Sequence, residues 1–186
     1  GTNTTRPSSR RVMPSPPATS FSIRTEWGVV TVTGYGASPS ESRFASVRGV
    51  TLPVLIAPSV LPADFSKIGE EVRALDEAGV DIIQWDVMDG QFVPNLTFGP
   101  DVIASARSYS TKPFEAHLMV LTPDVMAQRY VEAGCQRLIV HAEACTHLHR
   151  TLENIRGMGA TAAVALNPHT PASTIENVLD LVDMVL

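Results

Sequence analysis

The chain has 186 residues, of which 44% are apolar and 18% are charged, and this balance excludes a wholly disordered chain. Its net charge of −5 includes no run of Lys or Arg, so nucleic acid and anionic membranes are not expected partners. The apolar runs have the length of strands, which argues against a transmembrane helix. The two cysteines, Cys135 and Cys145, lack disulfide-framework or zinc-ligand spacing and indicate reduced thiols in a cytosol-like compartment.

The first fifty residues differ in composition from the rest of the chain. They hold six Arg and two Glu, a net charge of +4, together with 16 Ser or Thr and five Pro. One run, 28–35 (GVVTVTGY), has a strand-like pattern. We expect 1–50 to be a disordered leader, either absent from the mature protein or, given its Arg- and Ser-rich composition, an organellar transit peptide. The expected location is the cytoplasm, or a plastid if the leader is a transit peptide.

From Pro53 onward, strand-like apolar runs alternate with amphipathic helical segments. Strands are predicted at 53–59, 80–87, 113–120, 136–142, 160–167 and 182–186. Helices are predicted at 64–79, 98–109, 122–133, 146–159 and 170–180. Asp64 is suited to cap the first helix, and Gly79 is suited to end it.

This alternation predicts an α/β fold with a parallel sheet. Three segments share one plan of helix end, glycine and apolar strand, namely 76–83, 131–140 and 157–166. Strands that are apolar on both faces are typical of parallel sheets covered by helices. A doubly wound sheet and a (β/α)8 TIM barrel compete, but no GxGxxG follows the first strand to mark a dinucleotide fold. A barrel takes about 250 residues, so we predict that 51–186 is an incomplete TIM barrel with about six of its eight βα units.

Polar residues stand where these strands end, which is where barrels place their catalytic groups. They are Ser59, Asp86, His117, His141 and Asn167. Asp86 is the most informative, because a carboxylate inside an apolar strand is buried and then needs a partner or a metal. Ser59 can instead be a turn residue, and each of the two histidines can instead be an ordinary residue of the core.

Five strand-end motifs together resemble the ribulose-phosphate 3-epimerase family. The motifs are IAPSVLPADF (56–65), WDVMDGQFVPN (85–95), EAHLMV (115–120), IVHAEA (139–144) and ALNPHTP (165–171). They occur in the family's order and spacing, and the resemblance covers 52–186. The leader shows no such resemblance.

The resemblance implies a TIM barrel that interconverts D-ribulose 5-phosphate and D-xylulose 5-phosphate in the pentose phosphate pathway and the Calvin cycle. In the family one aspartate removes the C3 proton, a second returns it, and a divalent metal (Zn, Fe, Mn or Co) stabilises the enediolate. Asp86 matches the aspartate that is both metal ligand and acid/base, and His117 matches a histidine that binds metal and substrate. Ser59 matches a substrate-binding serine, and Met88 and Met119 match methionines that line the pocket. The full-length protein is expected to be a homo-oligomer.

Two departures from the family pattern bear on function. Gln84 stands where the family usually has a metal-ligating histidine, and a carboxamide is a harder and weaker ligand than imidazole. The second aspartate and the phosphate-binding loops of the family belong to strands beyond the six predicted here. Two alternatives therefore remain open: an epimerase of another ketose phosphate, and a non-catalytic barrel that binds phosphosugars. A lyase is disfavoured because the two lysines, Lys67 and Lys112, lie away from the strand ends.

Overall fold

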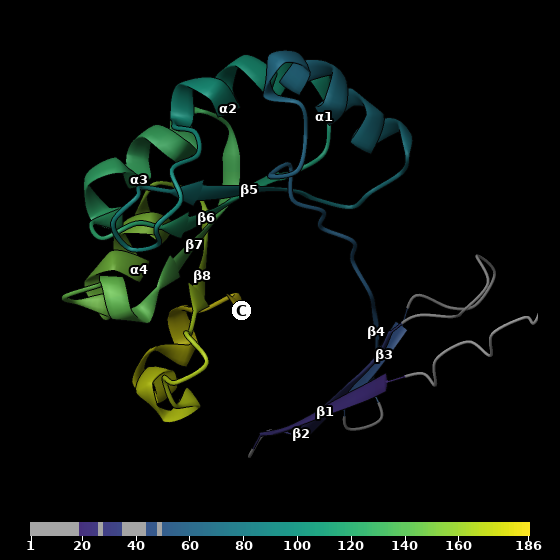
Figure 1. Ribbon diagram of the computed structural model, residues 1–186. Helices are drawn as coiled ribbons and strands as arrows, with labels where there is room; N and C mark the ends of the chain where they lie inside the picture. Colours follow the sequence, from purple (N-terminus) through teal and green to yellow (C-terminus); the bar gives the residue numbers. More distant parts are fainter. Residues whose placement is uncertain (1–18, 26–27, 35–43, 48–49) are drawn as a thin grey trace, which may run out of the picture. The chain divides into compact units, whose positions relative to one another are not determined.

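A computed structural model (Figure 1) describes the backbone of residues 19–25, 28–34, 44–47 and 50–53, and residues 54–186 with their side chains. The chain divides into two compact units, Gly1–Val54 and Leu55–Leu186, and each is described by itself. Within the described residues, no helix is both long enough and apolar enough to cross a membrane.

The described parts of the first unit are two antiparallel strand pairs. Strand β1 (Thr19–Thr25) pairs with β2 (Gly28–Gly34), and β3 (Phe44–Val47) pairs with β4 (Val50–Pro53). Strand β2 confirms the strand-like run at 28–35, whereas the other three strands were not anticipated. Strand β1 carries only two large apolar residues, and β3 and β4 have four residues each, which is too short to show a periodic pattern. The remaining part of the expected disordered leader lies outside the described residues.

The second unit is a parallel sheet with helices along one face (Figure 1). Its strands lie in the order β5-β6-β7-β8-β9, so each strand pairs with the next one in the chain. The strands are β5 (Ile83–Met88), β6 (Phe114–Met119), β7 (Cys135–His141), β8 (Thr161–Ala165) and β9 (Met184–Val185). The α-helices are α1 (Ile68–Glu77), α2 (Pro100–Ala106), α3 (Pro123–Glu132) and α4 (Leu148–Gly157). The 3-10 helices are η1 (Phe65–Lys67), η2 (Arg107–Tyr109), η3 (Ala142–Ala144) and η4 (Ala172–Leu181).

Five of the six predicted barrel strands are confirmed, but the buried strand predicted at 53–59 is wrong. This segment runs along β5 and joins it by one isolated parallel bridge, Ser59 to Gln84. The backbone N–H of Gln84 donates to the carbonyl of Pro58 at 2.9 Å, so the path is that of a strand. Pro53 and Pro58 have no N–H to donate, which limits the ladder. Ile56 is 46% exposed. An apolar side chain is buried only where another segment of the chain packs against it.

The helices begin and end largely where the sequence indicates. Asp64 caps η1 by accepting from the backbone N–H of Ser66 at 3.0 Å. Gly134 ends the turn after α3 with φ +100°, a conformation that a side chain would strain. The last predicted helix, 170–180, is instead the 3-10 helix η4.

The two faces of the sheet differ in the size of their buried side chains. Trp85, Phe114 and Leu138 are fully buried on the face that packs against the helices. The opposite face carries a smaller apolar cluster of Ile139, Ala163 and Ala165. Side chains alternate between the two faces along a strand. Asp86 and His117 therefore lie on this second face, while their neighbours in the sequence point toward the helices.

Candidate active site at the C-terminal edge of the sheet

Four of the five polar residues predicted at strand ends lie together at one edge of the sheet. Asp86 and His117 are register partners on β5 and β6, and His141 ends β7. The bridge between Ser59 and Gln84 brings the serine beside the aspartate. The fifth residue, Asn167, takes part through its backbone N–H rather than its side chain.

Asp86 is 8% exposed, and its carboxylate contacts three side chains. The Ser59 hydroxyl donates to its Oδ2, and Nε2 of Gln84 donates to its Oδ1 at 2.9 Å. Nδ1 of His117 lies 3.0 Å from the same Oδ1. Burial pushes the pKa of Asp86 upward, but the contacts with His117, Ser59 and Gln84 outweigh burial and hold the pKa below its ordinary value. The carboxyl group is therefore ionised at neutral pH.

Two imidazole rings extend this cluster across β6 and β7. Nε2 of His117 lies 2.9 Å from Nε2 of His141, and the rings are nearly parallel, with centroids 5.1 Å apart. His141 also contacts the ring of Phe92, at a centroid distance of 4.7 Å. The pKa of His141 is lowered, mainly by burial and to a lesser extent by the nearby His117. Glu143 acts in the opposite direction but does not outweigh them.

Glu143 continues the cluster and was missed in the sequence analysis, although it lies within the IVHAEA motif. Its Oε2 lies 3.4 Å from Nδ1 of His141. Its Oε1 accepts from the backbone N–H of Asn167 at 2.8 Å and from the hydroxyl of Thr170. Burial pushes the pKa of Glu143 upward, but these donors and His141 hold it below its ordinary value. An acid two residues after a strand-end histidine was the available signal.

Asp89 fixes the loop that follows β5. Its Oδ1 accepts from the backbone N–H groups of Gln91 and Phe92 at 2.9 and 2.8 Å, and its Oδ2 accepts from that of Leu121 at 2.9 Å. The carboxylate thus ties the loop after β5 to the loop after β6. Thr97 closes the other end of the loop by donating to the carbonyl of Asp86 at 2.9 Å.

The two methionines predicted to line the pocket occupy matching positions. Met88 and Met119 are register partners at the ends of β5 and β6, and both are partly buried. They follow Asp86 and His117 by two residues, so they share the same face of the sheet. Apolar thioether side chains here would shield a bound molecule from water on one side.

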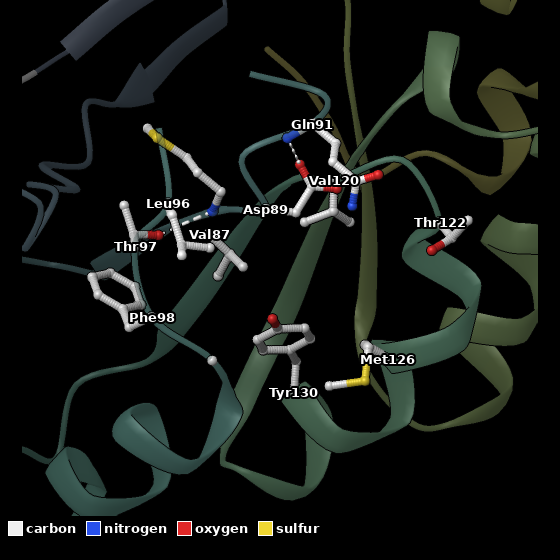
Figure 2. A pocket seen from close by; sticks show the side chains of 12 residues that line it. Val87, Asp89, Gln91, Leu96, Thr97, Phe98, Val120, Thr122, Met126 and Tyr130 are labelled. Carbon is white, nitrogen blue, oxygen red and sulfur yellow. Dashed lines mark hydrogen bonds between the residues drawn. The ribbon is translucent and has the colours of Figure 1, made fainter. Parts of the chain in front are cut away.

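A separate pocket lies on the helix side of β5 (Figure 2). It measures about 380 Å³, and Figure 2 shows Val87, Met126 and the ring of Tyr130 around it. Met88 is also among the residues that line this pocket. Asp86 and His117 are not among its lining residues, so it is distinct from the cluster described above.

The cysteines take no part in this chemistry. Both thiols are free. Burial raises the pKa of Cys135 to about 12 and that of Cys145 to about 11, so both stay protonated and unreactive.

Asp86 and His117 could hold a divalent metal as a pair. Their facing atoms, Oδ1 and Nδ1, lie 3.0 Å apart, somewhat closer than two tetrahedral ligands with bonds of about 2.0–2.2 Å. Gln84 would have to turn its amide, because its nitrogen now faces Oδ1 of Asp86. Among residues 54–186, no three His, Cys, Asp or Glu side chains form a group that could hold a metal. The described residues therefore supply a pair of candidate ligands and no complete metal site.

Fold and site together define an α/β protein of the TIM-barrel type, with its polar cluster where such barrels place their active sites. The crystal structure of KGPDC from Streptococcus mutans has a similar fold. It matches with a TM-score of 0.52 at 14% identity, over 70% of this chain and 60% of that one.

Sequence comparison identifies the family. Residues 55–186 match the ribulose-phosphate 3 epimerase family. The ribulose-phosphate 3-epimerase of Bacillus subtilis is 47% identical over 133 residues, 72% of this chain and 61% of that protein. The chloroplastic ribulose-5-phosphate-3-epimerase of Arabidopsis thaliana is 42% identical over 179 residues, 95% of this chain and 60% of that protein. The chain belongs to the ribulose-phosphate 3-epimerase family, and it spans about 60% of the length of these relatives.

Proposed function

We propose that the protein is a metal-dependent 3-epimerase that interconverts D-ribulose 5-phosphate and D-xylulose 5-phosphate. The observation that carries the proposal is the Asp86 carboxylate, buried at the C-terminal edge of the sheet and held by Ser59, Gln84 and His117. Relatives named ribulose-phosphate 3-epimerase support the choice of substrate.

Asp86 is the group that moves a proton. Epimerisation at C3 removes the proton beside the carbonyl and returns one to the opposite face of the enediolate. The ionised carboxylate accepts the C3 proton on its own face, and a second acid on the other face of the enediolate has to return one. Hydrogen bonds from neighbouring strands keep the carboxylate oriented, so little reorganisation is needed when substrate binds.

The other residues of the cluster bind and orient. Ser59 offers a hydroxyl to the substrate, and Met88 and Met119 exclude water from one side of the enediolate. Asp86 and His117 would hold the metal, with Gln84 in place of a third ligand. A divalent metal stabilises negative charge on the enediolate oxygens when bound. Zn, Fe, Mn and Co are all candidates for this ion.

The test is turnover with and without metal. The purified protein should convert ribulose 5-phosphate to xylulose 5-phosphate, lose activity with a chelator and regain it with one of the four metals. Faster turnover of a ketohexose 6-phosphate than of ribulose 5-phosphate would favour the alternative epimerase. Binding of ribulose 5-phosphate without exchange of its C3 proton would favour the non-catalytic barrel.

The relatives also bear on the location of the protein and on its oligomeric state. The chloroplastic Arabidopsis protein aligns with 95% of the chain, whereas the Bacillus protein aligns with 72%. This difference favours the plastid alternative over the cytoplasm, with residues 1–50 as a transit peptide. A fluorescent protein fused after residue 54 should then enter chloroplasts of leaf cells, and cytosolic fluorescence would refute the assignment. We also propose a homo-oligomer, which light scattering of the purified protein tests.

A further inference from the structure

The pocket on the helix side of β5 has a buried wall and an exposed mouth. Val87, Phe98 and Tyr130 form the buried wall, with 3%, 8% and 4% of their surfaces exposed. Leu96 also lines the pocket but is 79% exposed, so it stands at the mouth. The volume of about 380 Å³ lies within the range of about 300–1,000 Å³ that is usual for small-molecule sites. Since an apolar cavity of about 150 Å³ already holds benzene, this pocket has room for a ring that carries a substituent.

The hydroxyl of Tyr130 is the polar group of this buried wall. Figure 2 shows the ring extending from α3 so that the hydroxyl lies among the side chains that line the pocket. The hydroxyl has no hydrogen-bond partner among residues 54–186. Burial raises the pKa of Tyr130 to about 12, so the group keeps its proton at neutral pH and can donate it. Because buried tyrosine hydroxyls usually have a partner, this one indicates a position for an acceptor that a ligand would supply.

The charge at the pocket favours an uncharged ligand. Asp89 is the one charged side chain among the described residues that line it. Its two oxygens already accept from three backbone N–H groups. An anion, such as the phosphate of a sugar, would therefore be repelled by this carboxylate. A cation would find the carboxylate already hydrogen-bonded and would lose its hydration against the apolar wall.

We propose that this pocket binds an uncharged, largely apolar small molecule, about the size of a substituted benzene, with an oxygen that accepts a hydrogen bond from Tyr130. The apolar part of the ligand packs against Val87 and Met126, and removal of this surface from water supplies most of the affinity. The hydrogen bond determines which end of the ligand lies at the buried wall. Because Asp86 does not line the pocket, the site is separate from the site of the proposed function and does not depend on it.

The experiment uses acetophenone as the probe, because it is an uncharged ring with a carbonyl oxygen that only accepts. Ethylbenzene is the matched probe without the oxygen. The full chain is labelled with ¹³C at its methionine methyl groups and titrated in the NMR spectrometer. Met126 lines the pocket, whereas Met158 at the end of α4 does not. Acetophenone should shift the Met126 signal saturably at about millimolar concentrations, the range for a ligand of so few atoms, and should leave Met158 unchanged. Ribulose 5-phosphate should neither shift Met126 nor displace acetophenone.

Two tyrosine variants test the hydrogen bond. Tyr130→Phe removes the hydroxyl and keeps the ring, so it should weaken acetophenone binding about 2–12-fold, the net worth of one neutral hydrogen bond. It should not weaken the binding of ethylbenzene. Tyr109→Phe is the matched control, because Tyr109 is 38% exposed and does not line this pocket, and it should change neither affinity. Since the Tyr130 hydroxyl has no partner among residues 54–186, its removal should not lower the urea concentration at the unfolding midpoint.

Four results would overturn the proposal. The first, which needs no variant, is a Met126 signal that acetophenone does not shift saturably, or that ribulose 5-phosphate shifts as well. The second is an equal effect of Tyr130→Phe on both probes, because the pocket would then be an unspecific apolar cavity. The third is a loss of stability in Tyr130→Phe, which would show that the hydroxyl has a partner within the protein. The fourth is an affinity for acetophenone that rises when the protein is diluted, which would show that a second copy of the chain fills the pocket.

Discussion

Replacing Asp86 by Asn tests the proposed base with the smallest change in shape. The Asn carbonyl can still accept from Gln84, and its amide can donate to the Ser59 hydroxyl oxygen, so only the Ser59 hydroxyl proton has to turn to another acceptor. Charge-assisted hydrogen bonds of about 1.5–3 kcal/mol become neutral ones of about 0.5–1.5 kcal/mol. Removal of a buried charge offsets much of this loss. We expect a net change near the ~1 kcal/mol of an average substitution, small beside a typical stability of ~5–15 kcal/mol.

The rate should change far more than the stability. Loss of a general acid–base group costs about 10²–10⁴-fold, and a hundredfold loss corresponds to about 2.7 kcal/mol of barrier. The assay is exchange of the C3 proton of ribulose 5-phosphate with deuterium in D₂O, followed by NMR, because exchange requires only the first proton transfer. Asp101→Asn is the control, since Asp101 is an exposed acid paired with Arg129 at 2.7 Å. If folded Asp86→Asn exchanged the proton at nearly the wild-type rate, Asp86 would not be the base.

The remaining predictions concern the metal, acid stability and the opposite end of the sheet. Gln84→His should tighten Zn²⁺ or Fe²⁺ binding in calorimetric titrations, because imidazole suits these ions better than a carboxamide; no gain would argue against a metal ligand at this position. Because the folded-state pKa of Asp86 is depressed, its contribution to stability is present above the unfolded pKa of about 3.9 and is lost as pH falls through the lower folded value. The urea concentration at the unfolding midpoint should therefore decrease once the pH is below about 4, and it should decrease less steeply with pH in Asp86→Asn. Equal slopes in the two proteins would refute the linkage. Glu115→Gln should cost about 3 kcal/mol in urea unfolding, since Glu115 is 2% exposed and pairs with Arg137 at 2.9 Å, whereas the exposed Asp101→Asn should cost at most about 1 kcal/mol.

The sequence predicted strands best where burial comes from both faces. The apolar runs at 80–87, 113–120 and 136–142 correspond to β5, β6 and β7, whose helix-facing residues fill the main core. The run at 53–59 is just as apolar but is not a buried strand. Its side chains depend on contacts with distant segments, and its prolines interrupt the ladder. A local pattern reports how a segment can be buried, whereas tertiary neighbours decide whether it is.

The candidate site was predictable to a similar extent. Strand ends in a parallel sheet meet at one edge, so the positions of Asp86 and His117 in the sequence were enough to bring them together. The contact of His141 with Glu143 depends on the turn of η3 after β7, and the contact of Glu143 with Thr170 depends on the path of the loop after β8. Neither path follows from hydrophobic periodicity, so the position of Glu143 after His141 marked it as a candidate without indicating its contacts.

Because the contacts of Asp86 with His117 and of His117 with His141 join neighbouring strands, the site depends on the register of the sheet. Asp86 pairs with His117 across β5 and β6, and Val140, beside His141, pairs with Leu118 of β6. A slip of one residue in β6 would turn His117 toward the helices and bring Leu118 to the polar face. Such a slip would also expose the buried Phe114 and Ala116 and forfeit about 25 cal/mol for each Å² of apolar surface uncovered. The core on the helix side therefore holds His117 beside Asp86, and the chemistry of one face is specified by the packing of the other.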